Sequence, residues 1–219
     1  MDIRANVLIA VQLPQWWEDL AIERYRKHAA ADTIVSGSSL NEAQAERARR
    51  DGVEASLLAN ARLAEEAGAG VHILDCFSDP GMDYLASRLD APVVGVGHAG
   101  LLYAHGVFRR FAVISSEPAT VDEIRRRAVR YDLDARLGAV ECVGISAAEL
   151  PSRREEALTR LTEIGRGLPS DIEGIVMGCT ELAELAAPLE ASLDDRRIGA
   201  VNPIAIAMQF AEMRALNTR

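Results

Sequence analysis

Short apolar segments alternate with longer amphipathic segments along the chain. The short segments are rich in Val and Ile and mostly apolar at every position, which is typical of strands covered by helices on both faces. The alternation predicts an α/β fold, built from βα units around parallel sheets. The expected strands are Val7–Val11, Val71–Asp75, Pro92–Val96, Phe111–Ser115, Val140–Ile145, Gly174–Met177 and Ile198–Val201.

Helix-start signals precede the amphipathic segments. Three segments have the pattern of a capping box, in which Ser, Thr or a similar residue is followed three positions later by Glu. These are Ser39–Glu42, Thr120–Glu123 and Ser146–Glu149. Asp79-Pro80 and Asn202-Pro203 each place a proline directly after a good capping residue. We expect helices to begin at these five places.

Two stretches follow one plan. Val71–Cys76 is an apolar strand that ends in a cysteine and is followed by a helix and a further strand, and Gly174–Cys179 repeats this order. The layout predicts two similar α/β lobes of flavodoxin-like or Rossmann-like type. We expect residues 1–98 with 204–219 to form the first lobe and residues 99–203 the second. Each cysteine then lies at the carboxyl end of a strand, where open α/β sheets bind ligands.

Composition narrows the classes of partner. With 219 residues and 49% hydrophobic content, the chain can bury the core of such a fold. Its net charge of −9 argues against a nucleic-acid partner, because phosphate contacts need clustered Lys and Arg. No apolar run reaches the ~20 residues of a membrane span, and the first residues lack a signal-peptide pattern. We therefore expect a cytoplasmic protein with no membrane partner.

The three cysteines differ in their surroundings. Cys76 and Cys179 lie between a strand end and a helix start, where unpaired backbone N–H groups favour a thiolate and an anionic ligand. Cys142 lies inside an expected strand, so we interpret it as a core residue. No His or Cys stands at metal-ligand spacing from either of the first two, and a Cys-x-x-Cys redox motif is absent.

Two thiols on opposite sides of one carbon suit racemisation of a carbon acid. One thiolate removes the proton, and the other thiol returns a proton to the far face. Both sulfurs must come close to the reacting carbon, which places them very roughly 7 Å apart and excludes a disulfide. Gly95, Gly97 and Gly100 match a dinucleotide fingerprint by count, but no acidic residue ends the following strand. We therefore expect no nucleotide cofactor.

Several motifs resemble those of one superfamily. Asp75–Gly81, with Pro92–Gly97 after it, resembles the first half of hydantoin and allantoin racemases. Gly178-Cys179-Thr180-Glu181-Leu182 resembles the second-cysteine motif of the wider aspartate/glutamate racemase superfamily, and Asn202-Pro203 is similar to its ending. The resemblance implies a substrate held in a cleft between two α/β lobes, with no cofactor and no metal. We also expect a homo-oligomer.

The resemblance also implies roles for individual residues. It makes Cys76 and Cys179 the acid/base pair acting on a 5-substituted hydantoin or a related small carbon acid. Residues expected to hold the substrate are Ser78, Thr180, Ser115, Ser116 and Gln12. Gln12 belongs to a segment, Gln12–Trp17, that replaces the Asn-Pro-Asn-Thr-Ser type loop of hydantoin racemases. Its two tryptophans fit either packing or an aromatic wall for an apolar substituent.

Alternatives stay open at this point. The pair after the second cysteine, Thr180-Glu181, resembles that of amino-acid racemases. The pair after the first cysteine, Phe77-Ser78, differs from the Asn-Thr that is usual in those enzymes. A maleate-type isomerase would use one thiol as a nucleophile. A non-catalytic protein that binds small acids would carry inert cysteines. His98, just after the glycine-rich turn, fits a packing role at least as well as a place at the site.

Overall fold

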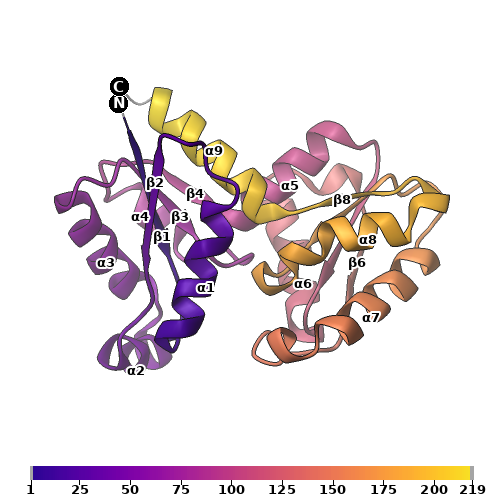
Figure 1. Cartoon of the computed structure of the whole chain (residues 1–219), viewed down its shortest axis with the longest axis horizontal. Coiled ribbons are helices and arrows are strands. Elements are labelled where there is room, and N and C mark those ends of the chain that lie inside the picture. The colour runs from indigo at the N-terminus through magenta and orange to yellow at the C-terminus, as the bar shows by residue number, and fades with distance from the viewer. Residues whose placement is uncertain (1, 218–219) are drawn as a thin grey trace. The chain divides into compact units, whose positions relative to one another are not determined.

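The computed structural model describes residues 2–217, and the chain separates into two compact units (Figure 1). Unit 1 contains the residues up to Val96 together with the segment from Ile204 onward, and unit 2 is Gly97–Pro203. Each unit has its own four-stranded sheet, and all recorded strand pairs are parallel. The predicted α/β class is confirmed.

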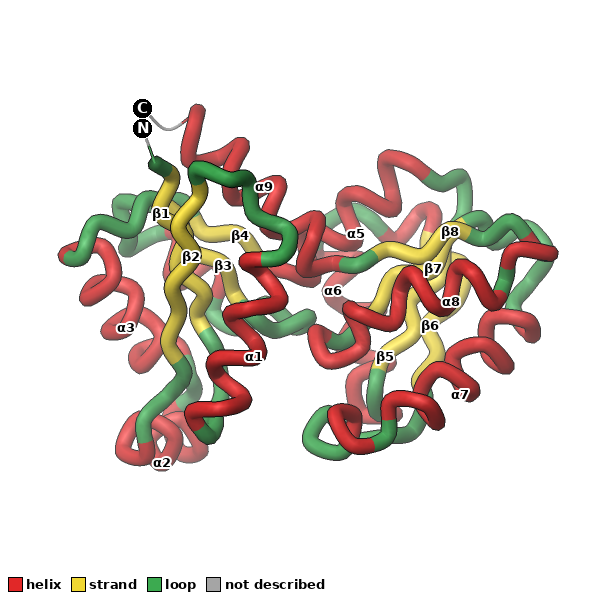
Figure 2. Tube along the Cα trace, in the orientation of Figure 1, coloured by secondary structure: helices red, strands yellow, loops and turns green. Residues whose placement is uncertain are grey.

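In unit 1 the strand order is β2-β1-β3-β4. The strands are β1 (Ile3–Leu8), β2 (Thr33–Ser38), β3 (Val71–Leu74) and β4 (Val93–Gly95). The helices are α1 (Gln15–Arg26), α2 (Glu42–Asp51), α3 (Glu54–Glu66), α4 (Met82–Ala86) and α9 (Pro203–Asn217). Figure 2 shows α1 and α3 on opposite faces of this sheet, which explains why β1 and β3 are buried at nearly every position.

Unit 2 repeats the topology with the order β6-β5-β7-β8. Its strands are β5 (Phe111–Ser115), β6 (Leu137–Cys142), β7 (Gly174–Met177) and β8 (Gly199–Val201). The α-helices are α5 (Val96–Val107), α6 (Pro118–Arg130), α7 (Arg154–Gly167) and α8 (Ala186–Ser192). Short 3₁₀ helices are η1 (Asp134–Arg136), η2 (Leu150–Ser152), η3 (Thr180–Leu185) and η4 (Asp194–Arg196).

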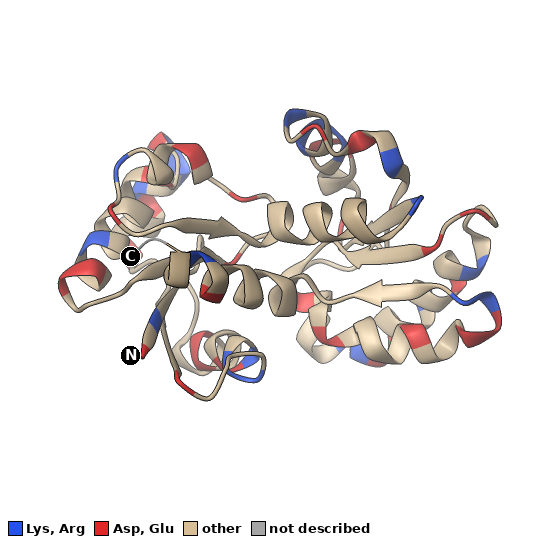
Figure 3. Cartoon of the chain, turned by 90° about the horizontal axis from the view of Figure 1, so that it is seen from above, with Lys and Arg blue, Asp and Glu red and all other residues tan. Residues whose placement is uncertain are grey.

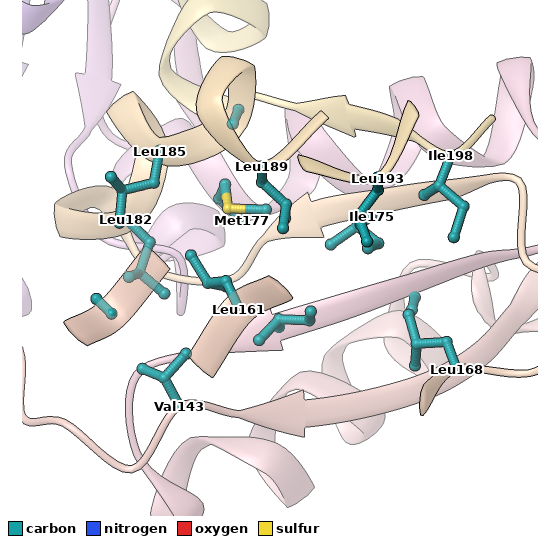
Figure 4. Packing of buried hydrophobic residues seen from close by; sticks show 14 of the residues in the cluster. Val143, Leu161, Leu168, Ile175, Met177, Leu182, Leu185, Leu189, Leu193 and Ile198 are labelled. Carbon is teal, nitrogen blue, oxygen red and sulfur yellow. The ribbon is translucent and has the colours of Figure 1, made fainter. Parts of the chain in front are cut away.

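One core cluster of unit 2 shows how strand alternation builds the fold. Alternate residues of β7, Ile175 and Met177, lie against Leu161 of α7 and Leu189 of α8 (Figure 4). All four are fully buried, and each such side chain stabilises the fold by about 1.5–3 kcal/mol relative to exposure. Charged side chains lie mainly on helices and loops, and few lie on the strands (Figure 3). Within the described residues, no helix has the length and apolar character needed to cross a bilayer.

The strand predictions hold where burial is greatest. Phe111–Ser115 and Gly174–Met177 are strands with the predicted bounds. The prediction for the first strand is wrong in its bounds, because β1 begins at Ile3 and polar positions within it obscure its start. The prediction for Val140–Ile145 is likewise shifted, since β6 is Leu137–Cys142. Strand β2 was not predicted, because this edge strand is half-exposed and polar in sequence.

Of the five predicted helix starts, only that at Asn202-Pro203 is confirmed, since α9 begins at Pro203. Helix α2 is capped by Asn41, whose side chain accepts the Gln44 N–H at 2.9 Å, two residues beyond the predicted Ser39. Thr120 lies inside α6, because a proline sets the start of that helix at residue 118.

The other two predicted helix starts form turns. Ser146 Oγ donates to Glu149 Oε2 at 2.6 Å, as in a capping box, but the backbone there forms a turn before η2. Asp79 has a positive φ of 44°, and α4 begins only at Met82.

Candidate functional site

Cys76 lies at the carboxyl edge of the unit 1 sheet. The Asp75 N–H donates to the Leu8 carbonyl at 2.9 Å and extends the pairing of β3 with β1 to the residue before the cysteine. The Cys76 carbonyl then accepts the Asp79 N–H at 3.0 Å. This turn fixes the backbone on both sides of the thiol.

The thiol of Cys76 has one hydroxyl and two carboxyl groups around it. Its Sγ lies 3.1 Å from the Ser78 Oγ in a hydrogen bond. Burial raises the pKa of Cys76 above its ordinary value, hydrogen bonds with Ser78 oppose this shift, and the carboxylates of Asp75 and Asp79 add to it. Cys76 is therefore a protonated thiol near neutral pH.

This result corrects one sequence expectation. The sequence predicted that a helix start directly after Cys76 would favour its thiolate. In the structure α4 begins at Met82, beyond a turn that ends in Gly81 with φ of 70°. The pKa of Cys76 is therefore raised by burial and by two carboxylates, and no helix N-terminus lies next to the thiol to lower it.

The buried side chain of Asp79 explains why residue 95 is a glycine. Asp79 is buried, and a Cβ added at Gly95 would collide with its carboxyl group. The space next to Gly95 thus holds a carboxylate of the same unit. Gly95 is required so that β4 can lie against the turn that carries Cys76.

Cys179 occupies the matching place in unit 2. It follows β7 after Gly178, has extended backbone, and directly precedes η3, whose Leu182 N–H donates to the Cys179 carbonyl at 3.0 Å. It is half-buried and packs against the core cluster of unit 2. Gly178 is needed here because a Cβ would come within 2.8 Å of Val113 Cγ1.

Ser115 fixes the backbone next to Cys179. Its hydroxyl is fully buried, donates to the Gly178 carbonyl at 3.0 Å, and accepts from Thr120 Oγ1 at 2.7 Å. The hydroxyl hydrogen is thus used within unit 2. These hydrogen bonds give Ser115 a structural role in the turn before Cys179, and its predicted contact with substrate stays a prediction.

The sequence of the chain matches the profile of one family, Asp/Glu/hydantoin racemase, over residues 19–211. The chain belongs to the Asp/Glu/hydantoin racemase family. A hydantoin racemase of Rhizobium meliloti is 26% identical over 159 residues, which are 71% of this chain and 64% of that protein. The chain thus spans less than two thirds of the length of this curated relative.

Solved structures of the same family share the fold. Allantoin racemase from Klebsiella pneumoniae has a TM-score of 0.80 and 21% identity, over 97% of this chain and 87% of its own. A glutamate racemase of Bacillus anthracis has a TM-score of 0.71 and 15% identity, over 97% and 80% of the two chains. The resemblance to this superfamily stated from the sequence motifs is confirmed.

The remaining predicted site residues of this family member lie on the same sheet edges. Thr180 is the first residue of η3 and is half-buried. Ser116 follows β5 and is 3% exposed, and its hydroxyl makes no hydrogen bond with the residues that the structure describes. Gln12 is exposed in the loop after β1, where it lines a groove of about 430 Å³ together with apolar residues and Arg49. Their contacts with substrate stay predictions.

Two further residues were interpreted from the sequence. Cys142 is the last residue of β6, paired in register with Ser115, and is half-buried. The prediction of a core cysteine is therefore wrong, because β6 is an edge strand and most of its positions are only half-buried. His98 lies on α5, and its ring contacts that of Tyr131 at a centroid distance of 4.5 Å, which agrees with a packing role. Across the described residues, no group of three or more His, Cys, Asp or Glu side chains could hold a metal ion.

Proposed function

We propose that this protein is a cofactor-independent racemase that uses Cys76 and Cys179 as its acid/base pair. The observation that carries the proposal is their equivalent place in the two units. Each cysteine follows the third strand of its sheet in the orders β2-β1-β3-β4 and β6-β5-β7-β8. Carboxyl ends of parallel strands are the usual ligand sites of such sheets, and membership of the racemase family supports the same reading.

The proposed reaction is a proton transfer on each face of one carbon. A thiolate takes the proton from the stereogenic carbon, the electron pair is delocalised into the adjacent carbonyl, and the opposing thiol delivers its proton to the other face. One proton leaves and one arrives, so the two cysteines exchange protonation states in each turnover. The proposal requires each sulfur to come within about 3–3.5 Å of that carbon.

The surroundings of Cys76 favour its protonated form. Burial and two carboxylates keep the pKa of Cys76 above its ordinary value. One of the two active monoanion forms has the proton on Cys76 and the thiolate on Cys179. Cys76 is then the donor for the enantiomer whose hydrogen faces Cys179, and the roles exchange for the other enantiomer.

The proposed substrate is a 5-substituted hydantoin, because the curated relatives are hydantoin racemases. The carbon at position 5 is flanked by a carbonyl, so its carbanion is stabilised. The test follows one enantiomer in D₂O and measures loss of optical activity together with deuterium at that carbon. At early times a two-base mechanism places deuterium in the product enantiomer and leaves the recovered substrate unlabelled.

Cysteine variants complete the test. Cys76→Ser and Cys179→Ser should each reduce racemisation by orders of magnitude, and Cys142→Ser is the matched control because this third thiol also ends a strand of unit 2. Full activity in both of the first two variants would exclude the proposed pair. Equal loss in the control would mean that the losses reflect folding.

A second candidate is racemisation of an amino acid, which the Thr180-Glu181 pair after Cys179 favours. The same exchange experiment with free aspartate and glutamate decides between the substrates. A covalent adduct trapped on Cys76 would instead favour a maleate-type isomerase. Thiols that resist alkylation in a protein that binds small acids without turnover would favour a binding role.

A further inference from the structure

A buried phenol lies behind the first thiol. Tyr25 of α1 is completely buried, and its hydroxyl donates to Asp75 Oδ1 at 2.7 Å. Asp75 immediately precedes Cys76 and is only half-buried. The backbone of Asp75 is held by β1 through the bond to Leu8, so α1 and β1 together fix both ends of this residue.

The charges in this region are coupled to the thiol. Burial raises the pKa of Tyr25 well above its ordinary value, the Asp75 carboxylate adds to the shift, Arg24 opposes it, and ionised Cys76 adds to it. The phenol is therefore a neutral donor at every pH at which the protein would work. Around Cys76 itself, Ser78 lowers the pKa of the thiol, whereas Asp75 and Asp79 raise it.

We propose that Tyr25 is a positioning residue for Cys76, because its hydroxyl holds the carboxylate of Asp75, the residue directly before Cys76. The inference rests on the proposed acid/base role of Cys76. The half-exposed carboxylate can turn towards water when the phenol oxygen is removed, whereas the fully buried ring of Tyr25 cannot follow it. Loss of the hydroxyl then weakens the negative field at the sulfur, and Cys76 gives up its proton more readily.

The experiment measures the Cys76 thiol directly. Iodoacetamide labelling at a series of pH values, with peptide mapping to separate Cys76 from the other two cysteines, gives its titration in four proteins. These are the unmodified protein, Tyr25→Phe, Asp75→Asn, and the double variant. Tyr84→Phe is the matched control. It removes a phenol oxygen of the same unit, and this oxygen makes no hydrogen bond with the described residues.

We expect Tyr25→Phe to label Cys76 about threefold faster or more at fixed pH below the thiol pKa, since labelling follows the thiolate fraction. Asp75→Asn should accelerate labelling further, and the double variant should match Asp75→Asn alone. An unchanged or slower rate in Tyr25→Phe overturns the inference. Equal acceleration by Tyr25→Phe in both backgrounds also overturns it, because the tyrosine would then act independently of the carboxylate.

A second readout connects the thiol to turnover. The equilibrium constant of racemisation is one, so kcat/KM must be equal for the two enantiomers, and its pH profile reports the thiol pair as a whole. We expect the alkaline limb of this profile to move to lower pH in Tyr25→Phe and to stay in place in Tyr84→Phe. The labelling result stands whether or not hydantoins are turned over, so failure of the proposed function is distinguishable from failure of this inference.

Discussion

Replacing Ser115 with alanine tests the structural role that the hydroxyl has next to Cys179. The Ser115 hydroxyl donates to the Gly178 carbonyl and accepts a hydrogen bond from Thr120 Oγ1. Without Ser115 Oγ, the Thr120 hydroxyl can still donate to the Glu117 carbonyl, which lies 2.7 Å away. A lost neutral hydrogen bond costs about 0.5–1.5 kcal/mol, and a buried acceptor left unpaired costs about 1–3 kcal/mol. Because Thr120 stays satisfied and only the carbonyl is left, we expect Ser115→Ala to destabilise the protein by about 2 kcal/mol.

Ser116→Ala is the control, since this neighbouring residue is also buried and its hydroxyl makes no hydrogen bond with the described residues. We expect it to change stability by less than about 0.5 kcal/mol. Urea denaturation followed by circular dichroism gives the two free energies of unfolding. Fluorescence adds an internal reference, because both tryptophans, Trp16 and Trp17, lie in unit 1. Hydrogen exchange should locate the effect at the Gly178 amide, which is bonded to the Ile114 carbonyl.

The variants of Ser115 and Ser116 also distinguish a structural role from a role in substrate binding. If Ser116 contacts substrate, Ser116→Ala raises KM while stability is kept, whereas Ser115→Ala lowers stability and kcat together. A Ser115→Ala protein as stable as the unmodified one would refute the reasoning. So would a greater loss of stability in the Ser116 variant, because the buried hydrogen bonds of Ser115 would then not be what holds the turn.

Three further outcomes follow from the same structure. Gly95→Ala should destabilise unit 1 by about 1–3 kcal/mol, because the added methyl group collides with the buried Asp79 carboxyl group. Gly106 lies in a helix with open space around it, so Gly106→Ala should stabilise the protein by up to about 1 kcal/mol. Thermal unfolding measures both changes. Ser78→Ala removes a hydrogen bond that lowers the pKa of Cys76, so iodoacetamide labelling of that thiol should slow at fixed pH. Burial holds the pKa of His72 below its ordinary value, so unfolding takes up a proton as the pH falls, and unit 1 should lose stability below about pH 6.5. Urea denaturation followed by tryptophan fluorescence tests this, and a flat profile between pH 5 and pH 8 would contradict it.

The repeated βα layout was predictable because buried parallel strands have a strong sequence signal. Strands β5 and β7 are largely apolar on both faces, and each is preceded by a charged residue, Arg110 or Glu173, so their starts are evident from the sequence. Strand β2 has no such signal, since Ser36, Gly37 and Ser38 give it the composition of a loop. Its strand geometry comes from pairing with β1 over six residues, which is a tertiary contact.

The site was predictable only in part, for a similar reason. The place of Cys76 and Cys179 after a strand follows from sequence order alone. The groups that tune the first thiol come from elsewhere in the chain, and nothing in the sequence links Tyr25 of α1 to Asp75 at the end of β3. The hydroxyl of Ser115, which the resemblance implies as a substrate contact, bonds to the neighbouring strand end, and this structural role could not be predicted from the sequence. The predictions of a homo-oligomer and of a cytoplasmic location stay predictions.

The two units share a topology, but they hold their cysteines differently. The Cys76 sulfur has a hydroxyl partner and two nearby carboxylates, whereas the turn before Cys179 is fixed by a serine through a backbone carbonyl. A racemase does not need symmetric thiols, because an equilibrium constant of one constrains the overall reaction and not the proton affinity of each base. What the proposed mechanism needs is that both monoanion forms, one with the proton on Cys76 and one with the proton on Cys179, are reached in the working pH range, because each enantiomer is deprotonated by a different thiolate. The Asp75 carboxylate raises the proton affinity of Cys76, and the Asp75→Asn titration measures how much this one charge contributes.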